Sequence, residues 1–151
     1  MSTIIQGSDL RTLTLGQRAE KSTGTLAATT VDLFTIAGGE VLLTSIYGKV
    51  TTAITVANSY KLLNNPTTGT SSDIVAATDI GTTDTPAGSF LGFDGVAASS
   101  ITQGVGITPT LARPLAIATG VIQSVSAGTD GVILWVVTWV PLTTGATLVA
   151  A

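Results

Sequence analysis

The side chains best suited to chemistry in this sequence are acidic residues close to glycines, namely Asp73, Asp79, Asp84, Asp94 and Asp130. Two carboxylates about 5–9 Å apart can hydrolyse a glycoside, and acidic loops can bind calcium. The segment 79–84 lacks the alternating ligands and terminal glutamate of an EF-hand loop. Aspartates in turns commonly accept hydrogen bonds from their own backbone. We therefore predict turn aspartates, with no catalytic, cofactor or metal site. A carboxylate-dependent hydrolase stays open as an alternative that needs two acids in one cleft.

The amino-acid composition excludes several other kinds of catalytic site. The chain has 151 residues with no histidine and no cysteine. This excludes Ser-His-Asp and Cys-His arrangements, thiolate or histidine metal sites, and disulfides. The formal net charge is −3 with only six basic residues, which argues against a nucleic-acid partner because phosphate binding needs clustered Lys and Arg. We expect a protein that is not an enzyme.

Threonine, valine and isoleucine point to an all-β fold. The 28 threonines and the other β-branched residues fit pleated, half-buried surfaces and lose side-chain freedom in helices. Short strand-like runs alternate with Gly, Pro, Asn and Asp turns, and no long amphipathic helix is evident. We predict a single-domain antiparallel β-sandwich over 25–151, jelly-roll-like, with roughly eight strands.

Two segments of this domain resemble β-hairpins. In the first, Gly38-Gly39 separates the runs 31–36 and 40–47, and tight hairpin turns need positive φ. Gly48 is predicted to mark a bulge or bend before the next run. In the second, the loop 127–131 separates 121–126 from the apolar run 132–140.

The run 132–140 is apolar on both faces, as in a strand buried on both sides. It puts Trp135 and Trp139 on one face, and we predict that both lie in the core or at a trimer interface. With Tyr47 and Tyr60 they could instead form a sugar-binding platform, the weaker of the two readings. The run is too short to cross a bilayer, which takes about 20 residues. We expect no membrane partner.

Residues 1–24 differ from the rest of the chain. They hold half of all the basic residues but keep neither a helical nor a strand rhythm over a useful length. One interpretation is an extended N-terminal arm that orders on a partner through Leu10, Arg11, Leu13, Leu15 and Arg18. The other is an ordinary first strand with a frayed, polar terminus. No basic start followed by an apolar run is visible, so no secretory signal peptide is expected.

Two stretches, 33–54 (LFTIAGGEVLLTSIYGKVTTAI) and 131–149 (GVILWVVTWVPLTTGATLV), resemble small virion proteins of tailed phages, some of them capsid decoration or cement proteins with β-sandwich or jelly-roll folds. They cover about a third of the chain, and their motifs are structural, without a catalytic signature. The resemblance implies homotrimers on the outer capsid surface, bound to the major capsid protein and made in the host cytoplasm. Few charges and a negative net charge agree with a surface that neighbours cover, outside the DNA-facing lumen. A glycan-binding or fibre-associated β-module of the virion is the alternative.

Overall fold

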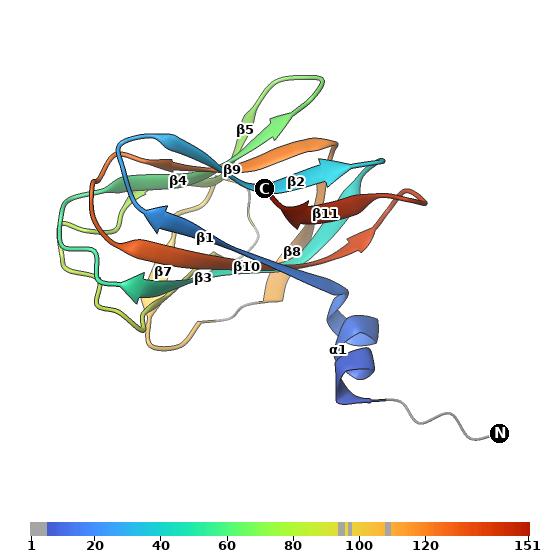
Figure 1. Cartoon of the computed structure of the whole chain (residues 1–151), viewed down its shortest axis with the longest axis horizontal. Coiled ribbons are helices and arrows are strands. Elements are labelled where there is room, and N and C mark those ends of the chain that lie inside the picture. Colours follow the sequence, from blue (N-terminus) through green and yellow to red (C-terminus); the bar gives the residue numbers. More distant parts are fainter. Residues whose placement is uncertain (1–5, 94–95, 97, 108–109) are drawn as a thin grey trace.

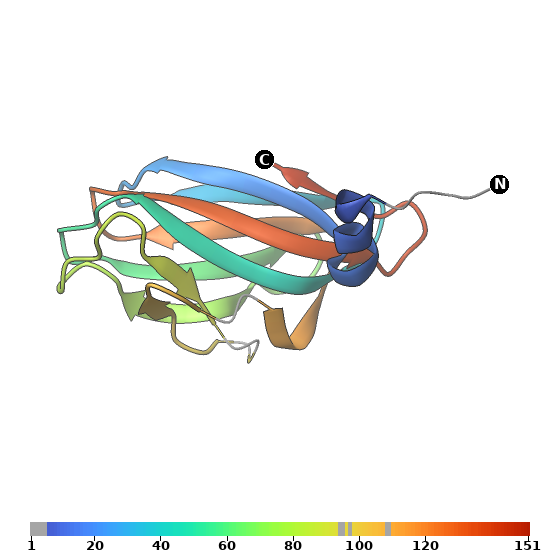
Figure 2. The same cartoon turned by 90° about the horizontal axis from the view of Figure 1, so that it is seen from below.

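In the computed structural model, which describes residues 6–93, 96, 98–107 and 110–151, two antiparallel sheets pack face to face as a β-sandwich with one short helix (Figures 1 and 2). The elements are α1 (Gly7–Leu15), β1 (Gln17–Thr25), β2 (Thr30–Ala37), β3 (Val41–Thr52), β4 (Ser59–Pro66), β5 (Ser72–Asp79), β6 (Phe90–Gly92), β7 (Thr102–Gly104), β8 (Thr110–Ile117), β9 (Gly120–Ser126), β10 (Val132–Pro141) and β11 (Thr147–Ala150). The predicted antiparallel β-sandwich is therefore confirmed, in a mostly β chain with eleven strands in the described residues where roughly eight were expected.

Sheet A contains the strands in the order β1-β10-β3-β6-β7, and β8 pairs with β3 beside β6. The long strand β3 makes this possible, because its residues 47–49 pair with β6 and its residues 41–45 pair with β8. Sheet B has the order β11-β2-β9-β4-β5. Hydrophobic side chains from both sheets meet in one core between them.

Both hairpin predictions are wrong, because each of these turns carries the chain from one sheet to the other. Gly38 and Gly39 have positive φ as expected, but they connect β2 in sheet B to β3 in sheet A. The loop 127–131 likewise connects β9 in sheet B to β10 in sheet A. Positive φ permits a sharp turn but does not determine whether the two flanking strands pair with each other. Here each flanking strand buries its apolar face from a different sheet, so the turn crosses between the sheets.

Polar contacts fix the second of these crossings. The Asn58 side-chain oxygen accepts hydrogen bonds from the backbone N–H groups of Ala127 and Gly128, at 3.0 and 2.9 Å. In return, the Asp130 carboxylate accepts hydrogen bonds from the backbone N–H and hydroxyl of Thr55, at 2.8 and 2.7 Å. The β3–β4 and β9–β10 connections therefore hold each other at one end of the sandwich.

Gly48 is not a bend between two strands, because β3 runs unbroken from Val41 to Thr52. Gly48 lies beneath the indole of Trp135, where an added Cβ would lie 2.9 Å from Ile133 and 3.2 Å from the ring. This glycine therefore makes room for a tryptophan in the core. The bulges on β3 occur instead at Thr44 and at Thr51, where the pairing with β10 slips by one residue.

The segment 1–24 is not an extended arm over the part that the structure describes. Residues 17–25 form β1, which pairs with β10 along the edge of sheet A from Gln17 opposite Trp139 to Thr25 opposite Val132. Residues 7–15 form α1, which stands at one end of the sandwich (Figure 2). The strand interpretation therefore holds for 17–25, and the domain includes residues that we expected to lie outside it.

Candidate functional site

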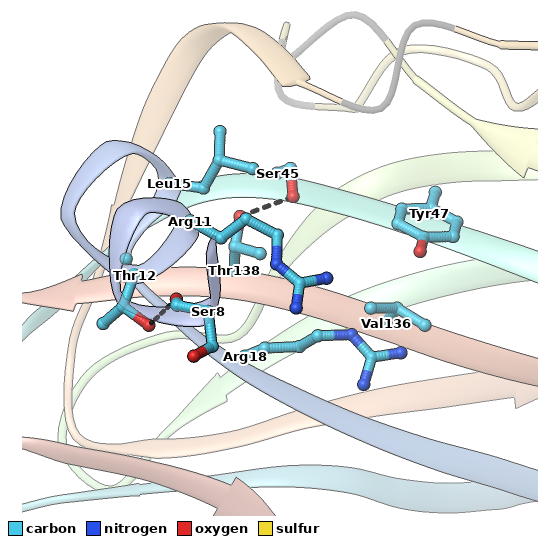
Figure 3. A pocket seen from close by; sticks show the side chains of 10 residues that line it. Ser8, Arg11, Thr12, Leu15, Arg18, Ser45, Tyr47, Val136 and Thr138 are labelled. Carbon is cyan, nitrogen blue, oxygen red and sulfur yellow. Dashed lines mark hydrogen bonds between the residues drawn. The ribbon is translucent and has the colours of Figure 1, made fainter. Parts of the chain in front are cut away.

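The outer face of sheet A carries a hollow where α1 lies over it. Strand alternation on β10 turns Trp135 and Val137 into the core and leaves Val136 and Thr138 on the outer face. The space between the helix and this face has a volume of about 460 Å³. Residues that line it include Ser8, Arg11 and Thr12 on the helix and Tyr47, Val136 and Thr138 on the sheet (Figure 3).

A cluster of hydroxyls ties α1 to this face. The bulge at Thr44 directs two consecutive side chains of β3 toward Thr138, so that Thr44 and Ser45 lie 2.7 and 2.5 Å from the Thr138 hydroxyl. The Thr44 hydroxyl also donates to the backbone carbonyl of Leu15, at 2.5 Å. The last carbonyls of a helix have no partner within the helix, so this bond holds the C-terminal end of α1 on the sheet.

Gly16 makes the sharp turn from α1 into β1. Its φ of 92° lies in a region that side chains rarely adopt, and its N–H bonds to the Thr12 carbonyl at 2.9 Å. An added Cβ would lie 2.2 Å from the carbonyl oxygen of Trp139 and 2.7 Å from a Val140 methyl. The helix can therefore meet the sheet at this angle only with glycine here.

Two arginines point along the hollow. Arg11 on α1 and Arg18 on β1 extend their guanidinium groups to the same side, toward Val136 and Tyr47 (Figure 3). Arg18 forms an exposed ion pair with Glu20 at 2.5 Å. Among the described residues, Arg11 has no ion-pair partner. The hollow thus has two cations and one anion at its edge, above an apolar floor at Val136.

A second, smaller hollow lies next to the first. It has a volume of about 280 Å³ and is lined by Tyr47, Phe90, Gly106 and Ile107. The Tyr47 and Phe90 rings lie 6.2 Å apart and tilted by 59°. Because Tyr47 lines both hollows, they adjoin on the outer face of sheet A.

The five predicted partner-binding residues separate into two groups. Arg11, Leu15 and Arg18 meet at the first hollow. Leu10 and Leu13 are 59% and 75% exposed on α1 and do not line it. The segment that holds these five residues is a helix and a strand rather than an extended arm.

The tryptophans lie inside the sandwich. Trp135 is 1% exposed and Trp139 is 3% exposed, and both contribute to the core cluster. Of the two predicted locations, core or trimer interface, the structure shows the core. Tyr60 is also fully buried, so a sugar-binding platform built on these three residues is wrong, and only Tyr47 of the four aromatics reaches the outer surface.

The turn interpretation is confirmed for Asp79, whereas Asp130 lies in a turn but binds the neighbouring connection at Thr55 and Val56. Asp79 accepts hydrogen bonds from the backbone N–H groups of Gly81, Asn58 and Thr82, at 3.0–3.2 Å. Hydrogen bonds from the Thr82 side chain and then from Gly81 hold the pKa of Asp79 well below its ordinary value. The Thr55 side chain and backbone likewise lower the pKa of Asp130. Backbone and hydroxyl donors therefore occupy both carboxylates, from the following turn and Asn58 for Asp79 and from the β3–β4 connection for Asp130.

Asp73 pairs with Lys61 at 2.8 Å, and Asp94 lies outside the described residues. Within the described part of the chain, no three His, Cys, Asp or Glu side chains gather where they could hold a metal ion. No helix in that part is long and apolar enough to cross a membrane.

Sequence reasoning missed most of the sheet side of the site. Tyr47 was considered only as an aromatic, and Val136 only as the apolar back of the tryptophan strand. Local sequence does not show that Thr44, Ser45 and Thr138 meet, because a bulge and a pairing across 94 residues bring them together. The run of Thr44 and Ser45 between buried Leu43 and Ile46 was the one available hint of a bulge.

Comparison with known proteins leaves the chain without an assigned family. No family model, no curated protein and no solved structure matches it.

Proposed function

We propose that this chain is a non-enzymatic structural protein of a tailed-phage virion, a decoration protein that binds the outer capsid surface and stabilises the shell. The residues resembling such proteins form β3, β10 and most of β2 and β11, and their motifs are strand patterns that do not specify a contact surface. The proposal therefore needs support from a surface feature of the chain itself. Helix α1 supplies it.

The observation that carries the proposal is the exposure of Leu10 and Leu13 on a helix with no buried residue. A helix of nine residues is marginal in water without tertiary packing. In the described structure α1 is held on the sheet at its C-terminal end, through the Gly16 turn and the Thr44 bond to Leu15, and its Gln6–Asp9 contact lies within its own first turn. A partner that covers the two leucines would supply the packing that the domain does not.

The expected strength of this contact favours a repetitive partner. Full burial of a leucine side chain contributes about 1.5–3 kcal/mol, so two leucines give a weak contact for one copy. A capsid offers many equivalent sites, and linked copies bind far more tightly than single ones. The resemblance implies a homotrimer, which would present three helices together. A jelly-roll-like strand connectivity belongs to the same proposal.

Stabilisation of the shell follows from mass action. A protein that binds the assembled shell but not free subunits shifts the equilibrium toward assembly. A low surface charge reduces repulsion when many copies are packed side by side, and the chain has only fifteen ionisable Lys, Arg, Asp and Glu residues.

The test mixes purified heads of the phage that encodes the chain with the intact protein, then measures occupancy by sedimentation and DNA release on heating. The variant L10S/L13S should lose most of its occupancy and its protection against heat. The matched control is L142S, which alters an exposed leucine (53% exposed) in the loop between β10 and β11. If intact protein does not bind heads, the decoration function is wrong. If L10S/L13S binds like the control, α1 is not the contact.

The oligomeric state is tested separately by light scattering with sedimentation equilibrium. We expect three copies at micromolar concentration. A monomer would contradict the trimer without affecting head binding.

A further inference from the structure

We propose that the hollow between α1 and the outer face of sheet A binds a single carboxylate of an extended protein segment, with Arg11 as the principal contact. The proposal rests on the decoration function for the source of that segment, a capsid subunit, but the chemistry of the site follows from its own residues. These are Arg11, Arg18, Glu20, Tyr47 and Val136.

The charges at the hollow favour a ligand with one negative charge. The chain as a whole is negative, yet two of its six basic side chains point along one hollow (Figure 3). Glu20 already neutralises Arg18 at 2.5 Å, which also holds that guanidinium in place. Arg11 adds one charge that no described acid offsets. A ligand with one negative charge brings the local balance to zero.

The floor of the hollow is apolar, which favours hydrogen bonds between the arginines and a carboxylate. Val136 is 3% exposed although it lies on the outer face of the sheet, and Leu15 and Tyr47 border it. An apolar floor keeps water from one side of the arginines, and charge-assisted hydrogen bonds are stronger where the local dielectric is low. An arginine guanidinium also matches a carboxylate in a planar, two-bond geometry.

The same balance disfavours a phosphate. A phosphate monoester carries about −1.5 to −2 at pH 7 and is best bound by several unpaired cations. Here Glu20 stands beside Arg18 and would repel the second charge. A nucleic-acid backbone is disfavoured for a separate reason, because it needs a row of basic groups.

The adjoining hollow indicates which kind of residue lies next to the Asp or Glu in the bound segment. Phe90 and Ile107 line it, and Tyr47 forms the boundary with the first hollow. A volume of about 280 Å³ accepts one apolar side chain. We therefore infer a segment in which an Asp or Glu is followed closely by an apolar residue such as Leu.

The test uses the full chain and a defined probe, N-acetyl-Asp-Leu-amide, with N-acetyl-Asn-Leu-amide as its neutral counterpart. Amide NMR titration should show shifts at Ser8, Thr12, Tyr47 and Val136 with the Asp probe. The Asn probe should bind at least about tenfold more weakly, since it lacks the charge that strengthens a hydrogen bond to the guanidinium. Equal binding of the two probes would overturn the proposal, as would tighter binding of inorganic phosphate at the same residues.

Variants separate the arginine from general charge effects. R11M should weaken the Asp probe by about tenfold or more, and R11K should retain part of the affinity because it keeps the charge without the fork geometry. R113M is the matched control, since Arg113 is an exposed arginine on β8 and does not line either hollow. If R113M weakens the probe as much as R11M, the hollow is not the site.

Head binding distinguishes this inference from the proposed function. R11M should reduce occupancy on heads at 150 mM salt, and R113M should not. If R11M binds heads and the probe as the intact chain does, the carboxylate site is wrong and the decoration function stands. If the probe binds through Arg11 but the intact chain does not bind heads, the decoration function fails and the carboxylate site stands.

Discussion

The indole Nε1 of Trp135 on β10 donates a 2.7 Å hydrogen bond to the Tyr60 hydroxyl on β4, and the two rings lie nearly parallel with their centroids 6.1 Å apart. This pair joins sheet A to sheet B through the centre of the core. Ser124 on β9 makes a further hydrogen bond to the same hydroxyl. Both side chains are therefore buried with their polar atoms satisfied, which is the condition for placing Trp and Tyr in a core.

Truncation of this pair should be among the most destabilising changes in the chain. W135A removes a ring that is 1% exposed and should lower the free energy of unfolding by about 3–5 kcal/mol. Y60F leaves the indole N–H without an acceptor and should cost about 1–3 kcal/mol. Urea denaturation followed by tryptophan fluorescence and circular dichroism measures both. A midpoint like that of the intact chain for W135A would contradict its burial.

The sequence pattern predicted the burial of Trp135 but not its contact with Tyr60. The apolar run 132–140 and its alternation predicted a buried strand with both tryptophans on one face, and the structure shows this. Tyr60 was considered as part of a possible sugar-binding platform, and its hydrogen bond to Trp135 was not predicted. Pairing across 75 residues depends on sheet order, which local patterns do not specify.

The connections and the helix were less predictable. Gly38-Gly39 and the loop 127–131 have the residues of hairpin turns, yet both cross between sheets because their flanking strands bury faces on opposite sides of the core. Helix α1 has a weak apolar periodicity and no buried residue. Its position depends on Gly16 and on the Thr44 bulge, and neither is apparent within its own sequence.

Stability should fall at alkaline pH because of Tyr60. Burial, the largest cause, raises the pKa of Tyr60 far above its ordinary value of about 10. Above pH 10 the unfolded chain loses this proton while the folded chain keeps it, so the unfolded state becomes favoured. The contribution is complete below pH 10 and declines by up to about 1.4 kcal/mol per pH unit above it. Denaturant midpoints between pH 8 and 11 should decline less in Y60F, and parallel curves would contradict this assignment.

Asp79 should matter in acid, in the opposite direction. Its pKa is lowered in the folded state, first by the Thr82 side chain and then by the Gly81 N–H. Its contribution is present above the unfolded pKa of about 3.9 and is lost as the pH falls through the lower folded value. D79N should lose thermal stability at pH 7 and show a smaller decline below pH 4. Asp84 serves as the control through D84N, since its carboxylate accepts no such set of hydrogen bonds from the described residues. A glycan or ester turnover that D79N abolishes would overturn the structural interpretation of this residue.

The two glycines at the ends of α1, Gly16 and Gly7, give a matched pair of variants that tests how the helix is held on sheet A. G16A should destabilise the fold, because its φ of 92° disfavours any side chain by about 1–3 kcal/mol and the new Cβ would overlap the Trp139 carbonyl. G7A adds the same methyl group at the start of the helix, where nothing lies within 4 Å. It should leave the melting temperature unchanged or slightly higher, since alanine favours helix by up to about 1 kcal/mol. Melting curves and the rate of proteolysis within 7–15 test both variants. If G16A melts like G7A and its helix is cleaved no faster, the turn does not fix α1 on sheet A. The hollow would then lack a rigid wall.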